Sequence, residues 1–280
     1  QHGRVMAPAT GLDAVRHLGL SGGRIATISR TPLRGRDTVD ARGLVVAPGF
    51  IDLHAHGQND ESYGYYAMNG VTTALELETG IGPVARFYAE RAGKARVNYG
   101  GAASHFHARR IAFGDTLVPY EERARDTSTV WSHTPSTPAV IATVRAELGK
   151  SLDEGALGIG MGIAFTPGAT HFEILRNFEL CAERKVICFT HIRGAGGGVG
   201  GYPGLQEVLT GAMTTGAALH VVHINSSSGA NSGAPNVPDF LAAIRQARAH
   251  GVNVTTEAYP YTASSTLLQS SLYDRALDTP

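Results

Sequence analysis

From residue 45 onward, apolar runs that end in polar residues alternate with segments of helical periodicity. Apolar runs without internal alternation are typical of parallel strands, and their alternation with helices favours a parallel sheet joined by crossover helices. We predict seven strands, at 45–56, 72–78, 98–105, 156–165, 186–191, 220–225 and 252–259. Helices are predicted between them, for example at 139–148, 172–183 and 238–250. Repetition of this unit predicts an α/β fold, a TIM-type (β/α)8 barrel.

The first 47 residues have a different texture. Short strand-like pieces are separated by glycine and proline at turn positions, as in Ser21-Gly22-Gly23 and around Pro32. This pattern predicts a small β module. We therefore divide the chain into residues 1–47, part of a small β-sandwich, and residues 48–280, the barrel with strands one to seven.

Charge and composition restrict the partners. The 24 basic and 24 acidic residues of the 280-residue chain cancel, so nothing suggests binding to nucleic acid or to an anionic membrane. A small-molecule ligand fits better. No apolar run approaches the roughly 20 residues of a membrane span, which favours a cytoplasmic protein. Because the chain begins at Gln1, a removed leader and a secreted or periplasmic location stay open.

Histidines occur where several predicted strands end. His54 and His56 close the first strand, His191 closes the fifth and His223 lies near the end of the sixth. Alternate residues of a strand share a face, so the first pair can converge on one ion. The alternative for each is an ordinary hydrogen-bonded histidine. However, the carboxyl ends of barrel strands meet at one rim, and four imidazoles with a carboxylate suit zinc.

Several motifs resemble the amidohydrolase superfamily, in particular its branch of D-aminoacylases and N-acyl-D-amino-acid deacylases. They are Ala47-Pro48-Gly49-Phe50-Ile51-Asp52-Leu53-His54-Ala55-His56, Gly70-Val71-Thr72-Thr73, Gly155-Ala156-Leu157-Gly158-Ile159, Thr190-His191-Ile192-Arg193 and Tyr259-Pro260-Tyr261-Thr262-Ala263-Ser264-Ser265-Thr266. The resemblance implies a metal-dependent barrel hydrolase of N-acyl-D-amino acids, with His54, His56, His191 and His223 as metal ligands. It also implies a small β-sandwich built from both chain ends.

A carboxylate is expected to complete the ligand set. Many members of the superfamily use a carboxylated lysine on the fourth strand, but the lysines here, Lys94, Lys150 and Lys185, lie elsewhere. The deacylase branch instead uses a residue at the end of the second strand, where this chain has Glu76 and Glu78. We favour Glu78 because it is nearer the carboxyl rim. The alternatives are Glu76 and, for Glu78, a surface carboxylate.

The resemblance also supplies substrate-binding candidates. Tyr259 and Ser265 match positions that hold the substrate carboxylate, but the lysine of the branch is replaced by Asn225. We therefore expect Arg193 or Arg109 to pair with the carboxylate. His105 and Arg109 form a His-x-x-x-Arg pattern after the third strand, and a structural pair is the equal alternative.

A catalytic base is not assigned. The resemblance implies an aspartate at the end of strand eight, yet about twenty residues follow Tyr261, and Asp274 and Asp278 follow no apolar strand. We expect the barrel to be truncated before strand eight and this piece alone to show negligible hydrolysis.

Other functions of the same fold remain. They are a cyclic amidase, as in dihydroorotases and hydantoinases, a deaminase, and a catalytically inactive metal-binding homologue. The sequence leaves open the acyl group, D or L configuration, one or two zinc ions or another divalent metal, and homo-oligomerisation.

Two further features have plain interpretations. Cys181 and Cys188 are assigned to core packing because they form no Cys-x-x-Cys motif. The glycines at 158–162 are interpreted as a backbone bend, and the run at 194–201 as a loop beside the site, with a lid as the alternative.

Overall fold

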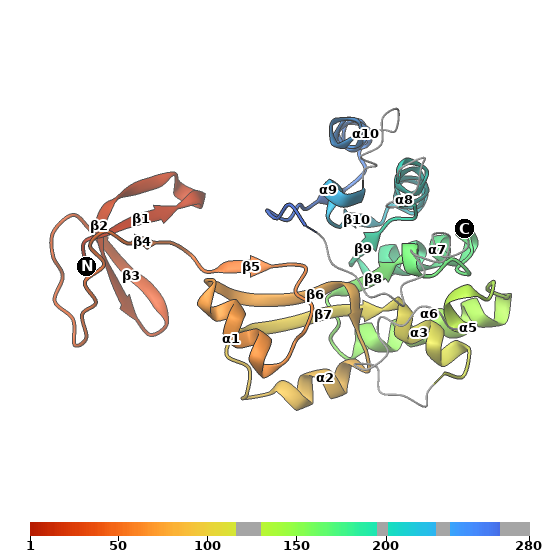
Figure 1. Ribbon diagram of the computed structural model, residues 1–280, viewed down its shortest axis with the longest axis horizontal. Coiled ribbons are helices and arrows are strands. Elements are labelled where there is room, and N and C mark those ends of the chain that lie inside the picture. The colour runs from red at the N-terminus through yellow and green to blue at the C-terminus, as the bar shows by residue number, and fades with distance from the viewer. Residues whose placement is uncertain (116–129, 195–200, 228–235, 264–280) are drawn as a thin grey trace.

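The computed structural model describes residues 1–115, 130–194, 201–227 and 236–263. These residues form two separate sheets. The smaller sheet, red to orange in Figure 1, lies apart from the rest of the molecule, and the segment containing β5 leads from it into the larger sheet (Figure 1). Nearly all of the helices belong to the larger part.

The small sheet has the strand order β3-β2-β1-β4. Neighbours β3, β2 and β1 are antiparallel, whereas β1 and β4 are parallel. Gly22 and Gly23, with φ of 57° and 72°, turn β2 into β3, a backbone that side chains other than glycine adopt at a cost. The bounds are β1 (Gly3–Ala7), β2 (Leu12–Ser21), β3 (Arg24–Ser29) and β4 (Val45–Val46), with a 3-10 turn at Pro8–Thr10. This sheet is consistent with the predicted β module, while its exact boundary and the sandwich stay predictions.

The large sheet contains seven strands that follow one another in chain order, and all neighbouring pairs are parallel. The strands are β5 (Phe50–Asp52), β6 (Val71–Ile81), β7 (Asn98–Ser104), β8 (Gly158–Gly162), β9 (Ile187–His191), β10 (Ala218–Val221) and β11 (Val254–Thr256). Each predicted strand overlaps one of them. The predicted parallel α/β organisation is therefore confirmed.

The large sheet is curled. Two strands, β7 and β8, separate β6 from β9, and at about 4.8 Å per step a flat sheet would hold β6 and β9 about 14 Å apart. Yet the Glu78 carboxylate of β6 contacts the imidazole of His191 at the end of β9. The sheet thus matches part of a TIM-type barrel. Within the described residues β5 and β11 are its two edges, and the expected truncation before strand eight falls on residues outside that part.

Helices connect the strands, and most begin at a side chain that caps the free amides of the first turn. The caps are Asn59, Ser104, Thr137, Thr170 and Asn236. The helices are α1 (Asp60–Met68), α2 (Val84–Arg91), α3 (His105–Ala112), α5 (Val130–His133), α6 (Pro138–Asp153), α7 (His171–Arg184), α8 (Tyr202–Thr215), α9 (Ile224–Ser227) and α10 (Val237–Ala249). A 3-10 turn, Ile163–Phe165, follows β8. All three helices predicted by range are present.

The main core lies between the helices and the outer face of the large sheet. It joins apolar side chains of α6, α7, α8 and α10 to those of β8, β9 and β10, including Leu148, Ile159, Phe178, Leu219 and Phe240. Cys181 of α7 and Cys188 of β9 belong to this core, as expected, but they are also joined by a disulfide bond, which their spacing did not predict.

One predicted strand is wrong in its extent and environment. Residues 45–56 do not form one buried strand, because β4 pairs in the small sheet and β5 pairs with β6 in the large one. Phe50 and Ile51 are 65% and 63% exposed, and β5 is an edge strand within the described residues. His54 and His56 follow β5 rather than ending it.

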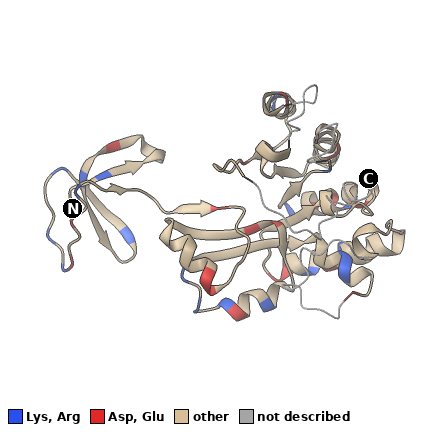
Figure 2. Ribbon diagram, in the orientation of Figure 1, with Lys and Arg blue, Asp and Glu red and all other residues tan. Residues whose placement is uncertain are grey.

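Charged side chains are spread over the molecule. Figure 2 shows basic and acidic residues interspersed on the small sheet and on the helices, whereas the strands of the large sheet carry only acidic ones, Asp52, Glu76 and Glu78. Within the described part of the chain, no helix is both long and apolar enough to cross a membrane.

Candidate metal centre

The segment after β5 brings His54 and His56 to the rim of the sheet. Its backbone continues to pair with β6, through a bridge between His54 and Glu76 and a hydrogen bond from the Ala55 amide to the Leu75 carbonyl. The Asp52 carboxylate accepts the His54 amide at 2.9 Å. These bonds fix the backbone, so both imidazoles turn toward the end of β6.

Glu78 lies in an irregular part of β6. The pairing of β6 with β7 shifts its register between Glu76 and Ile81, and Gly80 has a φ of +72°. A Cβ at Gly160 of β8 would lie 2.7 Å from the Glu78 carbonyl oxygen, so glycine there allows the close approach of the two strands. The bulge places the Glu78 side chain, 4% exposed, inside the curl of the sheet.

His191 and His223 approach from the opposite side. His191 is the last residue of β9, and His223 lies between β10 and α9 with a φ of +31°. A positive φ is uncommon for any residue other than glycine and carries strain, which is often found at functional sites. The Ser226 hydroxyl lies 3.0 Å from Nδ1 of His223. The other ring nitrogen of His223, Nε2, faces Glu78.

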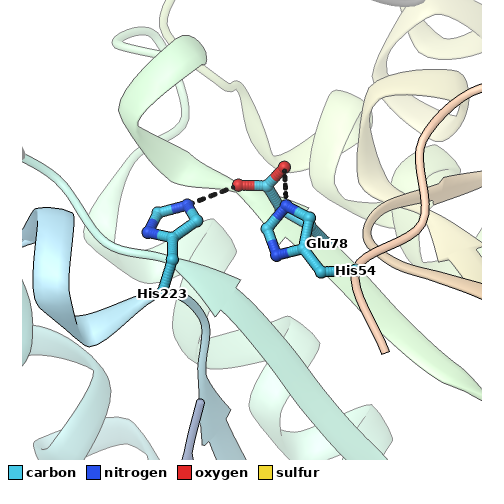
Figure 3. A group of neighbouring side chains, drawn as sticks. All are labelled: His54, Glu78 and His223. Carbon is cyan, nitrogen blue, oxygen red and sulfur yellow. Dashed lines mark hydrogen bonds and ion pairs between the residues drawn. The ribbon is translucent and has the colours of Figure 1, made fainter. Parts of the chain in front are cut away.

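The four histidines meet at the Glu78 carboxylate. Figure 3 shows His54 and His223 on two sides of it, with the dashed contacts running to different carboxylate oxygens. Oε2 lies 3.0 Å from Nε2 of His54 and 3.1 Å from Nε2 of His56, while Oε1 lies 2.9 Å from Nε2 of His223 and also contacts Nδ1 of His191. The predicted ligands are thus brought together.

The electrostatics of the cluster explain how a buried carboxylate is tolerated. Burial alone would raise the pKa of Glu78, but His191, His223 and His54 hold it well below its usual value. Burial lowers the pKa of His54, yet Glu257 and Glu78 together raise it to about 10. His56 behaves in the same way beside Glu76 and Glu78, with a pKa of about 9. The carboxylate therefore needs positive charge around it, from protons or from a cation.

The donor set fits a divalent metal. Donor atoms of His54, Glu78 and His223 all lie within 4.8 Å of one another. Imidazole nitrogens and carboxylate oxygens bind zinc at about 2.0–2.2 Å, so neighbouring ligand atoms around one ion lie about 3 Å apart. The Glu78 oxygens lie 3.0 Å from Nε2 of His54 and 2.9 Å from Nε2 of His223, which fits this spacing. The buried Nε2 of His191 has no hydrogen-bond partner within the described residues.

Comparison with known proteins supports this interpretation. The model of the "Amidohydrolase family" matches residues 37–164. N-acyl-D-glutamate deacylase of Alcaligenes xylosoxydans xylosoxydans is 29% identical over 90% of this chain and 54% of its own length. Dihydroorotase of Anaeromyxobacter sp. (strain K) is 30% identical over 92% of this chain and 58% of its own length.

One solved structure is similar to this chain in both sequence and fold. N-acyl-D-glutamate deacylase from Bordetella bronchiseptica, complexed with zinc and a phosphonate inhibitor, is 27% identical with a TM-score of 0.77, covering 96% of this chain and 59% of its own. The chain is therefore similar in sequence and fold to members of the amidohydrolase superfamily. Within the superfamily it resembles the D-aminoacylase and deacylase branch, and it spans somewhat more than half the length of these relatives.

The two candidate carboxylates of this chain have different places. Glu78 lies among the imidazoles, whereas Glu76 contacts Nδ1 of His56 and accepts the Thr79 amide at 3.2 Å. A third carboxylate, Glu257, lies directly after β11 and is 2.7 Å from Nδ1 of His54. Sequence reasoning missed Glu257, because the predicted strand runs to residue 259 and places this residue inside it, whereas β11 ends at Thr256.

The structure places His105 and Arg109 away from the histidine cluster, in a second buried cluster around Glu173 of α7. The Glu173 carboxylate contacts Nε2 of His105 and Nη1 of Arg109. The guanidinium also donates to the Trp131 and Thr134 carbonyls, and none of the three side chains is exposed. These contacts favour the structural-pair alternative, and substrate binding by either residue stays a prediction.

Of the remaining candidates, Tyr259 lies beside one of the four histidines. The Arg193 guanidinium donates to Glu207 at 2.8 Å and to the Ala169 carbonyl, so its charge is already paired. The Tyr259 ring lies 6.5 Å from the His223 ring between centroids, and the Asn225 amide donates to the Tyr259 carbonyl at 3.4 Å. Ser265 and most of the glycine run lie outside the described residues.

Proposed function

We propose that the protein is a metal-dependent amidohydrolase that cleaves a linear amide, with an N-acyl-D-amino acid as substrate. One observation carries the proposal: four imidazoles converge on the buried carboxylate of Glu78. The zinc-containing deacylase from Bordetella bronchiseptica supports zinc as the metal. One or two ions, or another divalent metal, fit the same residues.

His54, His56, Glu78, His191 and His223 would hold the metal. When bound, zinc supplies a water of pKa about 7 and polarises the amide carbonyl. The protein orients the donors: the β6 bulge aims Glu78, and the Phe165 ring packs against His191 with 4.6 Å between centroids. This contact helps to fix the orientation of the His191 ring.

Substrate recognition would come from the rim near β10 and β11. Tyr259 is the described candidate for binding the substrate carboxylate, and Ser265 is the second. Asn225 replaces the lysine of the branch, and both Arg109 and Arg193 are paired inside the protein. We therefore expect the substrate carboxylate to be bound by hydrogen bonds rather than by a positively charged side chain.

A second candidate is hydrolysis of a cyclic amide. It is favoured by the dihydroorotase relative, which is as similar in sequence as the deacylase. One barrel supports both reactions, because the substrate is selected by loops at the carboxyl ends of the strands.

The experiment is a metal analysis of the full-length protein followed by a substrate screen. We expect about one or two zinc ions per chain and turnover of N-acyl-D-amino acids above the L-isomers. Turnover of dihydroorotate or hydantoins instead would select the cyclic amidase, and bound metal without turnover of either class would support an inactive homologue.

Two ligand variants test the site itself. His191→Ala and His223→Ala should each lose metal, because each removes a donor next to Glu78. Unchanged metal stoichiometry in both variants would overturn the assignment.

A further inference from the structure

Three of the four histidines share one arrangement. His54, His56 and His223 each direct Nε2 toward Glu78, and each has Nδ1 next to another side chain. The Nδ1 partners are Glu257 for His54, Glu76 for His56 and Ser226 for His223. The orientation of each ring is therefore determined by contacts at both of its nitrogens.

Of these three Nδ1 contacts, the one with Glu257 joins the residues that are farthest apart in the sequence. It joins His54, which follows the edge strand β5, to a residue 203 positions later that follows β11, the other edge of the large sheet. Pairing between strands therefore cannot align these two side chains within the described residues. The 2.7 Å contact between Oε1 and Nδ1 does so directly.

Glu257 is itself held firmly. Its carbonyl oxygen accepts the amide of Ile224, the residue after His223, at 2.9 Å. The hydroxyl of the preceding residue, Thr256, donates to the Val221 carbonyl at 2.7 Å. The second carboxylate oxygen of Glu257, Oε2, lies 3.6 Å from Nε2 of His220. The backbone that positions His223 therefore also positions the carboxylate that reaches His54.

We propose that Glu257 is a positioning residue that holds His54 with its proton on Nδ1 and leaves Nε2 for the metal. The inference rests on the metal site proposed above. A carboxylate behind a metal-binding imidazole fixes its tautomer and orientation, and losing such a partner weakens metal binding about 10–100-fold. Glu257 itself need not touch the metal.

The test compares Glu257→Ala and Glu257→Gln in the full-length protein, with zinc as the probe. Glutamine keeps an oxygen that accepts the Nδ1 proton, whereas alanine removes it. We expect zinc affinity to fall about 10–100-fold in the alanine variant and to stay within a few-fold of wild type in the glutamine variant. Competition with a zinc chelator measures both.

A second readout reports the ring itself. Nitrogen-15 NMR of the zinc-loaded wild type and glutamine variant should show His54 protonated at Nδ1, and the alanine variant should lose that single tautomer. Glu90→Ala is the control, because Glu90 is an exposed glutamate that pairs with Arg86 outside the histidine cluster. It should change neither readout.

The outcomes separate the two proposals. A wild-type protein that binds no zinc would overturn both the metal site and the role of Glu257. Tight zinc binding by wild type and equally tight binding by Glu257→Ala would overturn the role of Glu257 alone. If the alanine variant does not fold, the glutamine variant decides. A loss of the Nδ1 tautomer of His54 together with a 10-fold or greater loss of zinc affinity in that variant would overturn the role of Glu257 as acceptor of the Nδ1 proton.

Discussion

Two buried glutamates, Glu173 and Glu78, are each the centre of a cluster that contains histidine, and the two clusters differ in what neutralises the carboxylate. Glu173 contacts the guanidinium of Arg109, a permanent cation, with further hydrogen bonds to backbone carbonyls. Glu78 instead contacts four imidazoles, which are cationic only when protonated. The first cluster is complete without a ligand, whereas the second takes its positive charge from protons or from a metal.

This difference distinguishes a structural cluster from a candidate functional one. Both clusters contain titratable residues with shifted pKa values, and such shifts alone do not identify a site. The partner of the carboxylate is more informative. An arginine fixes the charge, but imidazoles can exchange their protons for a metal.

The largest effect is expected when the guanidinium is removed from the Glu173 cluster. Arg109→Ala should lower the free energy of unfolding by about 3–5 kcal/mol, because it leaves Glu173 buried and unpaired. Urea unfolding measures the loss. Replacing both partners, as in Arg109→Met with Glu173→Met, should recover much of it, and Arg86→Ala at an exposed ion pair is the control. A loss below about 1 kcal/mol would show that Arg109 is not needed for stability.

The next effect concerns metal binding at the other cluster. Glu78→Gln should weaken zinc binding by about 100-fold or more, since it removes the charged donor that all four histidines contact. Chelator competition measures this, and Glu90→Gln is the matched surface control. Equal zinc affinity in the variant and wild type would contradict a ligand role for Glu78.

The pH dependence of stability should differ between the clusters above pH 7, whereas the lowered pKa values of Glu78 and Glu173 make both clusters lose stability on acidification. The pKa values of His54 and His56 are raised to about 10 and about 9, so their contribution is complete below the unfolded value near 6.5 and is lost toward pH 10. The lowered pKa values of His105 and Glu173 act in the opposite direction, since their contributions are lost on acidification, below about 6.5 for His105 and below about 4.5 for Glu173.

We therefore expect metal-free protein to lose stability between pH 7 and 9, measured by urea midpoints in the presence of a chelator. Zinc should abolish most of the decline, because it replaces the protons on His54 and His56. Equal midpoints at pH 7 and 9 without metal would contradict the expected titration.

The smallest effects come from one hydroxyl in each cluster. Ser136 contacts the Glu173 carboxylate and accepts from Arg109 at 2.8 Å, so Ser136→Ala should cost about 1 kcal/mol of stability and leave zinc affinity unchanged. Ser226→Ala should instead weaken zinc binding up to about 10-fold, because Ser226 faces Nδ1 of His223. Unfolding and zinc titrations of both variants would show whether the effects separate in this way.

Much of the site was predictable because its residues occupy equivalent positions in a repeated unit. His191 and His223 could be placed near one rim once the strands before them were recognised, and the choice of Glu78 over Glu76 agrees with the geometry. The extent of the first strand was not predictable. The apolar run at 45–56 has the composition of a buried strand, but its two halves pair in different sheets.

The sequence by itself determined the order of the seven strands, the parallel sheet and the candidate metal donors at its rim, because these follow from local periodicity and from motifs. Only the tertiary structure decided which carboxylate each histidine contacts, that Arg109 is paired with Glu173, and that Cys181 is bonded to Cys188. His54 and Glu257 are 203 residues apart, and no local pattern reports whether such residues meet. Their meeting depends on the curl of the whole sheet, which is a property of packing rather than of any one segment.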